Sequence, residues 1–344
     1  MKNLKISTIF ITIFTIIFII EIFFNPLEST EAAKYGLLLW YNKLIPSLLP
    51  FIIASNILIG VGGIAFFGTL LENIFYKLFN IPDTGIFPCI MGLISGCPLG
   101  AKITADLRVK KDLSHIDTIK VMSICNNSSP LFILGTVGVN MFKRPIIGAY
   151  IMLIIYFSVF STGIIFSFYG KRSKNNNILK GNILINAYNS QIKSRENNFK
   201  AFGTILGESI NNSMEIILKI GGFVIFFSVF STLLQLTPLF SILQYVFMPL
   251  LKALNINWDL FKGFLLGIIE ITNGIDIISR CSAPLKHQLI ACTCLISWCG
   301  LSIHAQIMSM INHSDIDFKL YIMSKLIQVL ITFIYSVIVF NIFF

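Results

Sequence analysis

The stretch LLENIFYKLFNIPDTGIFPCIMG, residues 70–92, is matched later in the chain by LQYVFMPLLKALNINWDLFKGFLLG, residues 243–267. Each has the pattern of an amphipathic helix followed by an Asn-Ile pair, an aspartate near a turn and a Phe-rich approach to a glycine. The same features in the same order at two places indicate an internal repeat.

Polar interruptions of apolar sequence follow both stretches in the same order. The first pair is SGCPLGAK at 95–102 and EITNGID at 270–276, and the second pair is NNSSP at 126–130 and CGLSIHAQ at 299–306. Because the matches keep a nearly constant offset, the sequence predicts two copies of one structural unit.

The composition is that of a membrane protein. Of the 344 residues 55% are hydrophobic and only 12% are charged, with a mean hydropathy of +0.82, whereas a soluble domain carries roughly 25% charged residues. A helix that spans the membrane needs about 20 apolar residues. The predicted spans are residues 6–24, 36–60, 118–141, 145–169, 213–236, 287–311 and 319–343. Regions 62–106 and 238–280 are also apolar, but Gly, Pro and polar residues interrupt them. Each region therefore fits two short or broken helices better than one continuous span.

The basic residues indicate how the chain crosses the membrane. The net charge is +10, but the basic residues lie between apolar runs, which fits the positive-inside rule rather than nucleic-acid binding. Residues 6–24 follow Lys2 and Lys5 without a small-residue cleavage site, so we expect a retained first helix. Segment 170–200 holds seven basic residues and one acid, which predicts a cytoplasmic loop.

Counting crossings from a cytoplasmic N-terminus places the start of the second copy on the opposite side from the first. This is an inverted-topology repeat, the architecture of many secondary transporters. Lys143, Arg144, Arg280 and Lys286 lie outside in this topology, against the positive-inside rule.

The interruption at 95–102 has the residue types of a broken helix that binds a solute. Non-helical backbone at membrane depth is tolerated where it is buried or lines a wet cavity, and a free helix N-terminus there attracts anionic groups. Ser95 is a residue type that often caps helix N-termini, and Pro98 suits a first helical turn. Gly96 and Gly100 allow close backbone approach. Lys102 adds a cation. The alternative is a proline kink with glycine packing.

The second interruption of the first copy contains four consecutive polar side chains before Pro130. Asn126, Asn127, Ser128 and Ser129 cannot all face lipid. They either line a solute site, which we favour, or bond neighbouring helices.

The second copy supplies the rest of the candidate site. Glu270, Thr272, Asn273 and Gly274 form its first interruption, and we expect the Glu270 carboxylate to bind a coupling cation or proton, or to pair with Lys102. The second interruption adds Ser302, His304 and Gln306. A lone histidine is more often a helix–helix bond than a ligand, but His304 lies opposite the NNSSP element in the repeat.

The sequence contains no pattern of catalysis. It lacks a nucleophile elbow, an HExxH pair and a P-loop. The seven cysteines lie inside or beside apolar segments without metal or disulfide spacing. We therefore predict no catalytic residue, no metal and no cofactor.

Three runs together resemble the YlbJ family of sporulation integral membrane proteins. They are MGLISGCPLGAKITADLR (91–108), CNNSSPLFILGTV (125–137) and GLSIHAQ (300–306), and the resemblance extends from about residue 46 to residue 311. That family falls in the wider group with the Gate, or nucleoside-recognition, domain, which includes concentrative nucleoside transporters and the membrane part of ferrous iron permeases. Cys97 stands where the pattern has an aromatic residue, and Cys299 where it has glycine.

The resemblance implies a protein made in the mother cell of an endospore-forming bacterium and needed for spore maturation. It implies a location in the outer forespore membrane and dipicolinate as cargo. A planar dicarboxylate would suit two facing half-helix N-termini together with Lys102. A non-transporting structural or assembly role, and a Gate-type carrier of a nucleoside or metal ion, are the alternatives.

We therefore predict an all-α polytopic membrane protein with two inverted-topology repeats of broken or re-entrant helices, similar to the Gate folds of concentrative nucleoside transporters. The expected divisions are an N-terminal helix and outer loop (1–35), a first repeat half with the following helix (36–169), a basic cytoplasmic loop (170–205), a second repeat half (206–311) and a C-terminal helix (312–344). The expected partners are the lipid bilayer and a small anion such as dipicolinate, without nucleic acid. A proton or sodium ion for coupling and a homo-oligomer are both compatible with the sequence.

Overall fold

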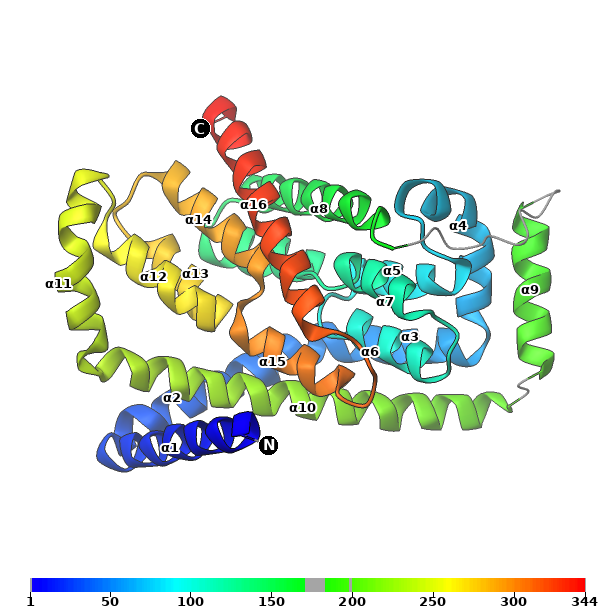
Figure 1. Cartoon of the computed structure of the whole chain (residues 1–344), viewed down its shortest axis with the longest axis horizontal. Coiled ribbons are helices and arrows are strands. Elements are labelled where there is room, and N and C mark those ends of the chain that lie inside the picture. The colour runs from blue at the N-terminus through cyan, green and yellow to red at the C-terminus, as the bar shows by residue number, and fades with distance from the viewer. Residues whose placement is uncertain (1, 171–182, 198–199, 344) are drawn as a thin grey trace.

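The computed structural model describes residues 2–170, 183–197 and 200–343, and the regular structure of these residues is helical (Figure 1). The first part of the chain forms α1 (Lys2–Phe24), α2 (Pro26–Leu39), the π-helical turn η1 (Trp40–Leu44), α3 (Ile45–Gly60), α4 (Gly63–Phe79), α5 (Asp83–Ile94), α6 (Leu99–Val109), α7 (His115–Ile124), the π-helix η2 (Phe132–Met141) and α8 (Pro145–Ser167). The second part forms α9 (Ile183–Asn197), α10 (Phe202–Leu236), α11 (Pro238–Ala253), α12 (Trp258–Ile269), α13 (Ile271–Arg280), α14 (Leu285–Trp298), α15 (Gly300–Ile311) and α16 (Phe318–Phe343).

The predicted internal repeat is confirmed by the order of the elements. The series α3 to α8, with η2 in the sixth place, is matched by the series α10 to α16. Asn80 and Asn255 follow the amphipathic helices α4 and α11, and both have a positive φ, 54° and 53°, a conformation that asparagine adopts more readily than most residues. These two residues are separated by the same number of positions as Gly92 and Gly267.

The two halves begin at opposite ends of the molecule. Figure 1 shows α10 along the length of the molecule, with α4 and α9 at one end of it and α11 at the other. Helices α9 and α11 lie across the direction of α10. This is the arrangement expected of an inverted repeat, in which equivalent elements start from opposite membrane faces.

Four helices of the described chain are long and apolar enough to cross a membrane: Pro145–Ser167, Phe202–Leu236, Leu285–Ile311 and Phe318–Phe343. The number rises to six if two bent pairs each count as one span, Ile11–Phe24 with Pro26–Asn42 (104°) and Leu48–Gly60 with Gly63–Phe79 (87°). The predicted spans 145–169, 213–236, 287–311 and 319–343 are therefore confirmed.

Three predicted spans are interrupted rather than single helices, and in two of them, 118–141 and 287–311, the interruption falls at a predicted polar break. Span 287–311 consists of α14 and α15 with Cys299 between them. Residues 36–60 include the end of α2, the turn η1 and α3, because Pro46 has no N–H with which to continue an α-helix. Residues 118–141 form α7 and η2 with a non-helical segment between them. Pro130 and the polar residues before it favour that break.

The predicted basic loop, 170–205, lies partly outside the described residues, at 171–182 and 198–199. Its described part contains α9, which packs against α4. Ser190 and Thr69 hydroxyls lie 2.9 Å apart, and the Gln191 amide donates to the Val61 carbonyl at 3.1 Å.

Each half contains a helical hairpin in which glycines allow close backbone contacts. A Cβ atom on Gly92 of α5 would lie 1.9 Å from the Cys125 carbonyl oxygen, and one on Gly100 of α6 would lie 2.2 Å from the same atom. In the second hairpin a Cβ on Gly274 of α13 would lie 2.2 Å from the Gly267 Cα of α12. Only glycine allows such approach, so these residues set the position of the hairpins.

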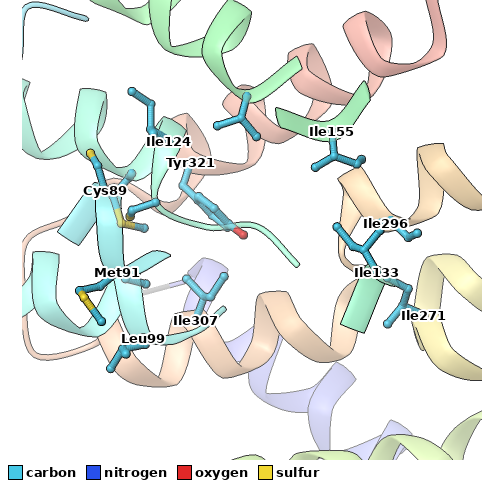
Figure 2. Packing of buried hydrophobic residues seen from close by; sticks show 14 of the residues in the cluster. Cys89, Met91, Leu99, Ile124, Ile133, Ile155, Ile271, Ile296, Ile307 and Tyr321 are labelled. Atoms are coloured by element: carbon cyan, nitrogen blue, oxygen red, sulfur yellow. The ribbon is translucent and has the colours of Figure 1, made fainter. Parts of the chain in front are cut away.

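One hydrophobic core joins the two halves. Figure 2 shows buried Ile124 and Ile133 of the first half together with Ile271 and Ile296 of the second. All four belong to the same cluster of buried side chains. The hairpins and broken spans of both halves are thereby held in one packed unit.

Replacing Gly92 by alanine is expected to lower the stability of the protein. The added methyl group meets backbone, which cannot move aside as a flexible side chain could, and overpacking of this kind costs about 1–3 kcal/mol. Gly222→Ala is the matched control, because a Cβ at Gly222 meets no atom within 4 Å. Thermal unfolding of the detergent-purified variants measures the difference, and equal midpoints for the two variants would contradict the packing described.

Candidate functional site

A cavity lies where the hairpin tips and the broken spans of the two halves meet. Ser95 and Cys97 line it from the first tip, and Glu270 to Thr272 line it from the second. The first broken span adds Ser128, Ser129, Phe132 and Thr136, and the second adds Ser302, Ile303 and Gln306, while Leu39, Leu44, Leu48, Ile220 and Val224 close it with apolar side chains. The cavity holds about 110 Å³.

In each half, a hydrogen bond between the hairpin tip and the broken span fixes the geometry of this cavity. In the first half the Cys97 N–H donates to the Asn127 carbonyl at 2.8 Å. In the second half the Trp298 indole donates to the Ile268 carbonyl at 3.1 Å. Each tip is thus tied to the broken span of its own half, and these bonds satisfy groups that would otherwise be unpaired at membrane depth.

Glu270 is the acidic residue of the cavity lining. It is 6% exposed, and its carboxylate caps α13 by accepting from the backbone N–H groups of Thr272 at 3.1 Å and Asn273 at 2.8 Å. The helix N-terminus that we expected to be free for an anion therefore already holds this carboxylate.

Ser95 does not cap a helix as predicted. It follows the last residue of α5, and the residue at the N-cap position of α6 is Pro98. The Ser95 hydroxyl is buried, lines the cavity and has no hydrogen-bond partner. Gly96, with φ of 82°, makes the turn between the two helices, because only glycine adopts that conformation without strain.

Lys102 and Glu270 do not meet. Lys102 lies in α6, where its amino group is 2.8 Å from the Asp106 carboxylate. It lines a second, more charged cavity of about 660 Å³ with Asp106, Lys110, Lys200 and Glu208. The predicted pairing was wrong because α6 leads away from the hairpin tip, so a residue one turn along it no longer faces the central cavity.

Neither Asn126 nor Asn127 lines the cavity, and only the Asn127 side chain bonds to α16. The Asn127 side-chain oxygen accepts from Gln328 at 2.9 Å and from the Lys325 amino group at 3.2 Å, and its amide donates to the Ile124 carbonyl at 2.6 Å. The Asn126 amide donates to the Met122 carbonyl at 3.0 Å. Of the four polar residues in this break, only Ser128 and Ser129 line the cavity.

The remaining predicted residues divide between cavity and packing. Thr272, Ser302 and Gln306 are buried and line the cavity. His304 is also buried, but its Nδ1 lies 2.9 Å from the Tyr321 hydroxyl and its Nε2 has no partner. Asn273 contributes its backbone N–H to Glu270, and Gly274 contributes close backbone packing.

A buried polar face on α16 was missing from the sequence prediction. Its four side chains are at most 1% exposed: Tyr321, Lys325, Gln328 and Thr332. Tyr321 contacts His304, and Thr332 contacts Ser297. Lys325 contacts Asn126 and Asn127, and Gln328 contacts Asn127. Their spacing of three or four residues was the available signal, because it places them on one side of a helix. A lysine inside an apolar span is also functional by default.

An ion pair outside the candidate membrane spans connects α6 of the first half with the loop that follows the second half. The Arg108 guanidinium donates two hydrogen bonds of 2.7 Å to the two carboxylate oxygens of Asp315, in the loop between α15 and α16. These bonds lower the pKa of Asp315 below its ordinary value. Within the described chain no group of three or more His, Cys, Asp or Glu side chains is placed to hold a metal ion.

The fold and the site define an integral membrane protein of the transporter-like class, with two sets of broken helices around a central cavity that contains several polar side chains. The Gate family model, described as nucleoside recognition, matches residues 217–314. The sporulation integral membrane protein YlbJ of Bacillus subtilis (strain 168) is 32% identical over 328 residues, which covers 94% of this chain and 80% of that protein. The chain belongs to the YlbJ family of sporulation integral membrane proteins.

Solved structures with a similar course of the chain include CNTnw in an inward-facing substrate-bound state, with a TM-score of 0.40 and 11% identity over 90% of this chain and 82% of that one. A CNTnw variant in the intermediate 1 state has a TM-score of 0.41 and 10% identity over 96% of this chain and 85% of that one.

Asn127→Ala is expected to lower the free energy of unfolding by on the order of 2 kcal/mol, because it leaves the buried Lys325 and Gln328 donors short of an acceptor. Asn140→Ala removes the same amide from an exposed position of η2 and serves as control. Thermal unfolding in lipid nanodiscs compares the two. A midpoint for Asn127→Ala as high as that of the control would show that the bonds to α16 contribute nothing.

Proposed function

We propose that this protein is a carrier that moves a small polar solute across a sporulation membrane and binds it in the central cavity. The observation that carries the proposal is the convergence of two hairpin tips and two broken spans on one cavity, whose mainly apolar walls carry a few polar side chains. Carriers built from inverted repeats hold their solutes at such a place, near the bilayer midplane. Seven of the predicted site residues line this cavity: Ser95, Ser128, Ser129, Glu270, Thr272, Ser302 and Gln306.

The cargo that we propose is dipicolinate, moved across the outer forespore membrane. Membership of a sporulation family supports a spore solute. A dicarboxylate in this cavity faces the Glu270 carboxylate, and two like charges in a buried site repel strongly. Carriage of the dianion therefore requires that Glu270 hold a proton or a sodium ion, which makes Glu270 the proposed coupling residue.

A nucleoside is the second candidate cargo. The Gate model that matches residues 217–314 is described as nucleoside recognition, and a neutral solute with hydroxyl and amide groups suits a cavity with one carboxylate, several hydroxyls and the Gln306 amide. A structural role in the sporulation membrane is the third candidate, supported by the bonds of α16 to the Asn126 main-chain carbonyl and the Asn127 side chain.

Proteoliposomes that contain the protein are expected to take up labelled dipicolinate saturably when a proton or sodium gradient is imposed. Glu270→Gln is expected to remove the dependence on the gradient, so that accumulation falls at least about tenfold while exchange without a gradient persists, because glutamine imitates a permanently protonated carboxyl. Glu215→Gln, which alters an exposed carboxylate of α10, should transport like the unaltered protein.

The same assay separates the candidates. Uptake of uridine in place of dipicolinate would favour the nucleoside. The three solutes tested are dipicolinate, uridine and a divalent metal ion. If none of them enters faster than into protein-free vesicles under either gradient, the carrier is excluded and the structural role remains.

A further inference from the structure

Lys325 is a buried cation surrounded by neutral oxygen atoms. Its side chain is fully buried in the first half of α16. The amino group donates to the main-chain carbonyl of Asn126, to the Asn127 side-chain oxygen at 3.2 Å and to the Gln328 side-chain oxygen at 2.9 Å. Two of these three oxygens belong to the non-helical segment that interrupts the first broken span.

No carboxylate balances this charge within the described part of the chain. The ion pairs of the described residues do not include Lys325, and Glu270 is bonded to the N-terminus of α13 instead. An unpaired ammonium in the protein interior is costly unless fixed dipoles replace its hydration. Here the dipoles are the three oxygens and the C-terminal end of α7, which is negative and ends at Ile124, just before Asn126.

Such an arrangement is that of a binding site for a small monovalent cation. Unwound carbonyls and the C-terminal ends of half-helices coordinate Na⁺ or accept protons in carriers with broken helices, and side-chain amide oxygens are ordinary ligands of hard cations. We infer that residues Asn126, Asn127 and Gln328 form a monovalent-cation site whose occupant is the tethered ammonium group of Lys325. The first broken span then needs no free ion to hold its shape, whatever solute the cavity binds.

Removal of the tether should convert the site into one for a free cation. In Lys325→Ala the oxygens stay in place and the space of the side chain opens, so the purified variant is expected to unfold at a lower temperature than the unaltered protein. Ammonium, methylammonium or sodium chloride at millimolar concentration should raise its midpoint saturably by about 3 °C or more, as a ligand of the folded state does. Choline chloride at the same ionic strength should not.

Two comparisons make the result specific. Lys219→Ala removes an exposed lysine of α10 and should respond to the salts no differently from the unaltered protein. Lys325→Met fills the space without a charge, and should be destabilised without any recovery in ammonium or sodium. A Lys325→Ala variant whose response to all four salts equals that of the unaltered protein would overturn the inference.

If Lys325→Ala does not fold even when it is produced and purified in ammonium, Lys325→Gln tests whether the site requires a cation. Glutamine retains N–H donors, one bond nearer the backbone, but carries no charge. A midpoint below that of the unaltered protein supports a site that requires a cation. A midpoint equal to that of the unaltered protein would show that only hydrogen bonding is required, and would contradict the inference.

Discussion

The structure depends on the hydrogen bonding of interrupted backbone in the interior of the molecule. Each half breaks its chain twice, at a hairpin tip and within a span, and each break exposes N–H and C=O groups that hydrocarbon cannot satisfy. Helix α16 supplies much of what is needed: Lys325 and Gln328 bond the first broken span, while Thr332 bonds Ser297, just before the break of the second. A helix that resembles a plain membrane anchor by composition is therefore the element against which both broken spans are positioned.

The two halves share a backbone design but differ in charge. Ser95 and Glu270 occupy equivalent places, three residues after Gly92 and Gly267. One supplies an unpartnered hydroxyl to the cavity and the other a carboxylate that caps α13. The positive charge lies behind the cavity, at Lys325, rather than in it. The proposed solute site thus has an acidic side formed by the second half, and in our inference the first half is held by a cation that belongs to the protein.

The sequence predicted the architecture because its signals are local and repeated. Asn80, the glycines of the hairpins and the polar interruptions have counterparts at a nearly constant offset, so the repeat, the hairpins and the meeting of their tips could be inferred. The direction of individual side chains could not. Ser95 has the residue type of an N-cap but follows the end of α5, and its hydroxyl caps neither helix. Lys102 is near the tip in sequence but lies on a helix that leads away from it.

The role of α16 could not be read from average hydropathy. Tyr321, Lys325, Gln328 and Thr332 are few among apolar neighbours, and only their common helical face shows that they act together. Their partners lie in other parts of the chain, so spacing alone does not identify them. The glycines at Gly92 and Gly100 illustrate the same limit, because the atom that requires them, the carbonyl oxygen of Cys125, belongs to a different element.

Solute counterflow tests the central claim of the proposed function, that the protein is a carrier of dipicolinate. Proteoliposomes are preloaded with unlabelled dipicolinate, diluted into a trace of labelled dipicolinate without any ion gradient, and sampled over time. A carrier exchanges internal for external solute, so the label should rise transiently above its external concentration and then decay. A rise to equilibrium without overshoot, or no entry beyond that of protein-free vesicles, would contradict carriage of dipicolinate by this protein.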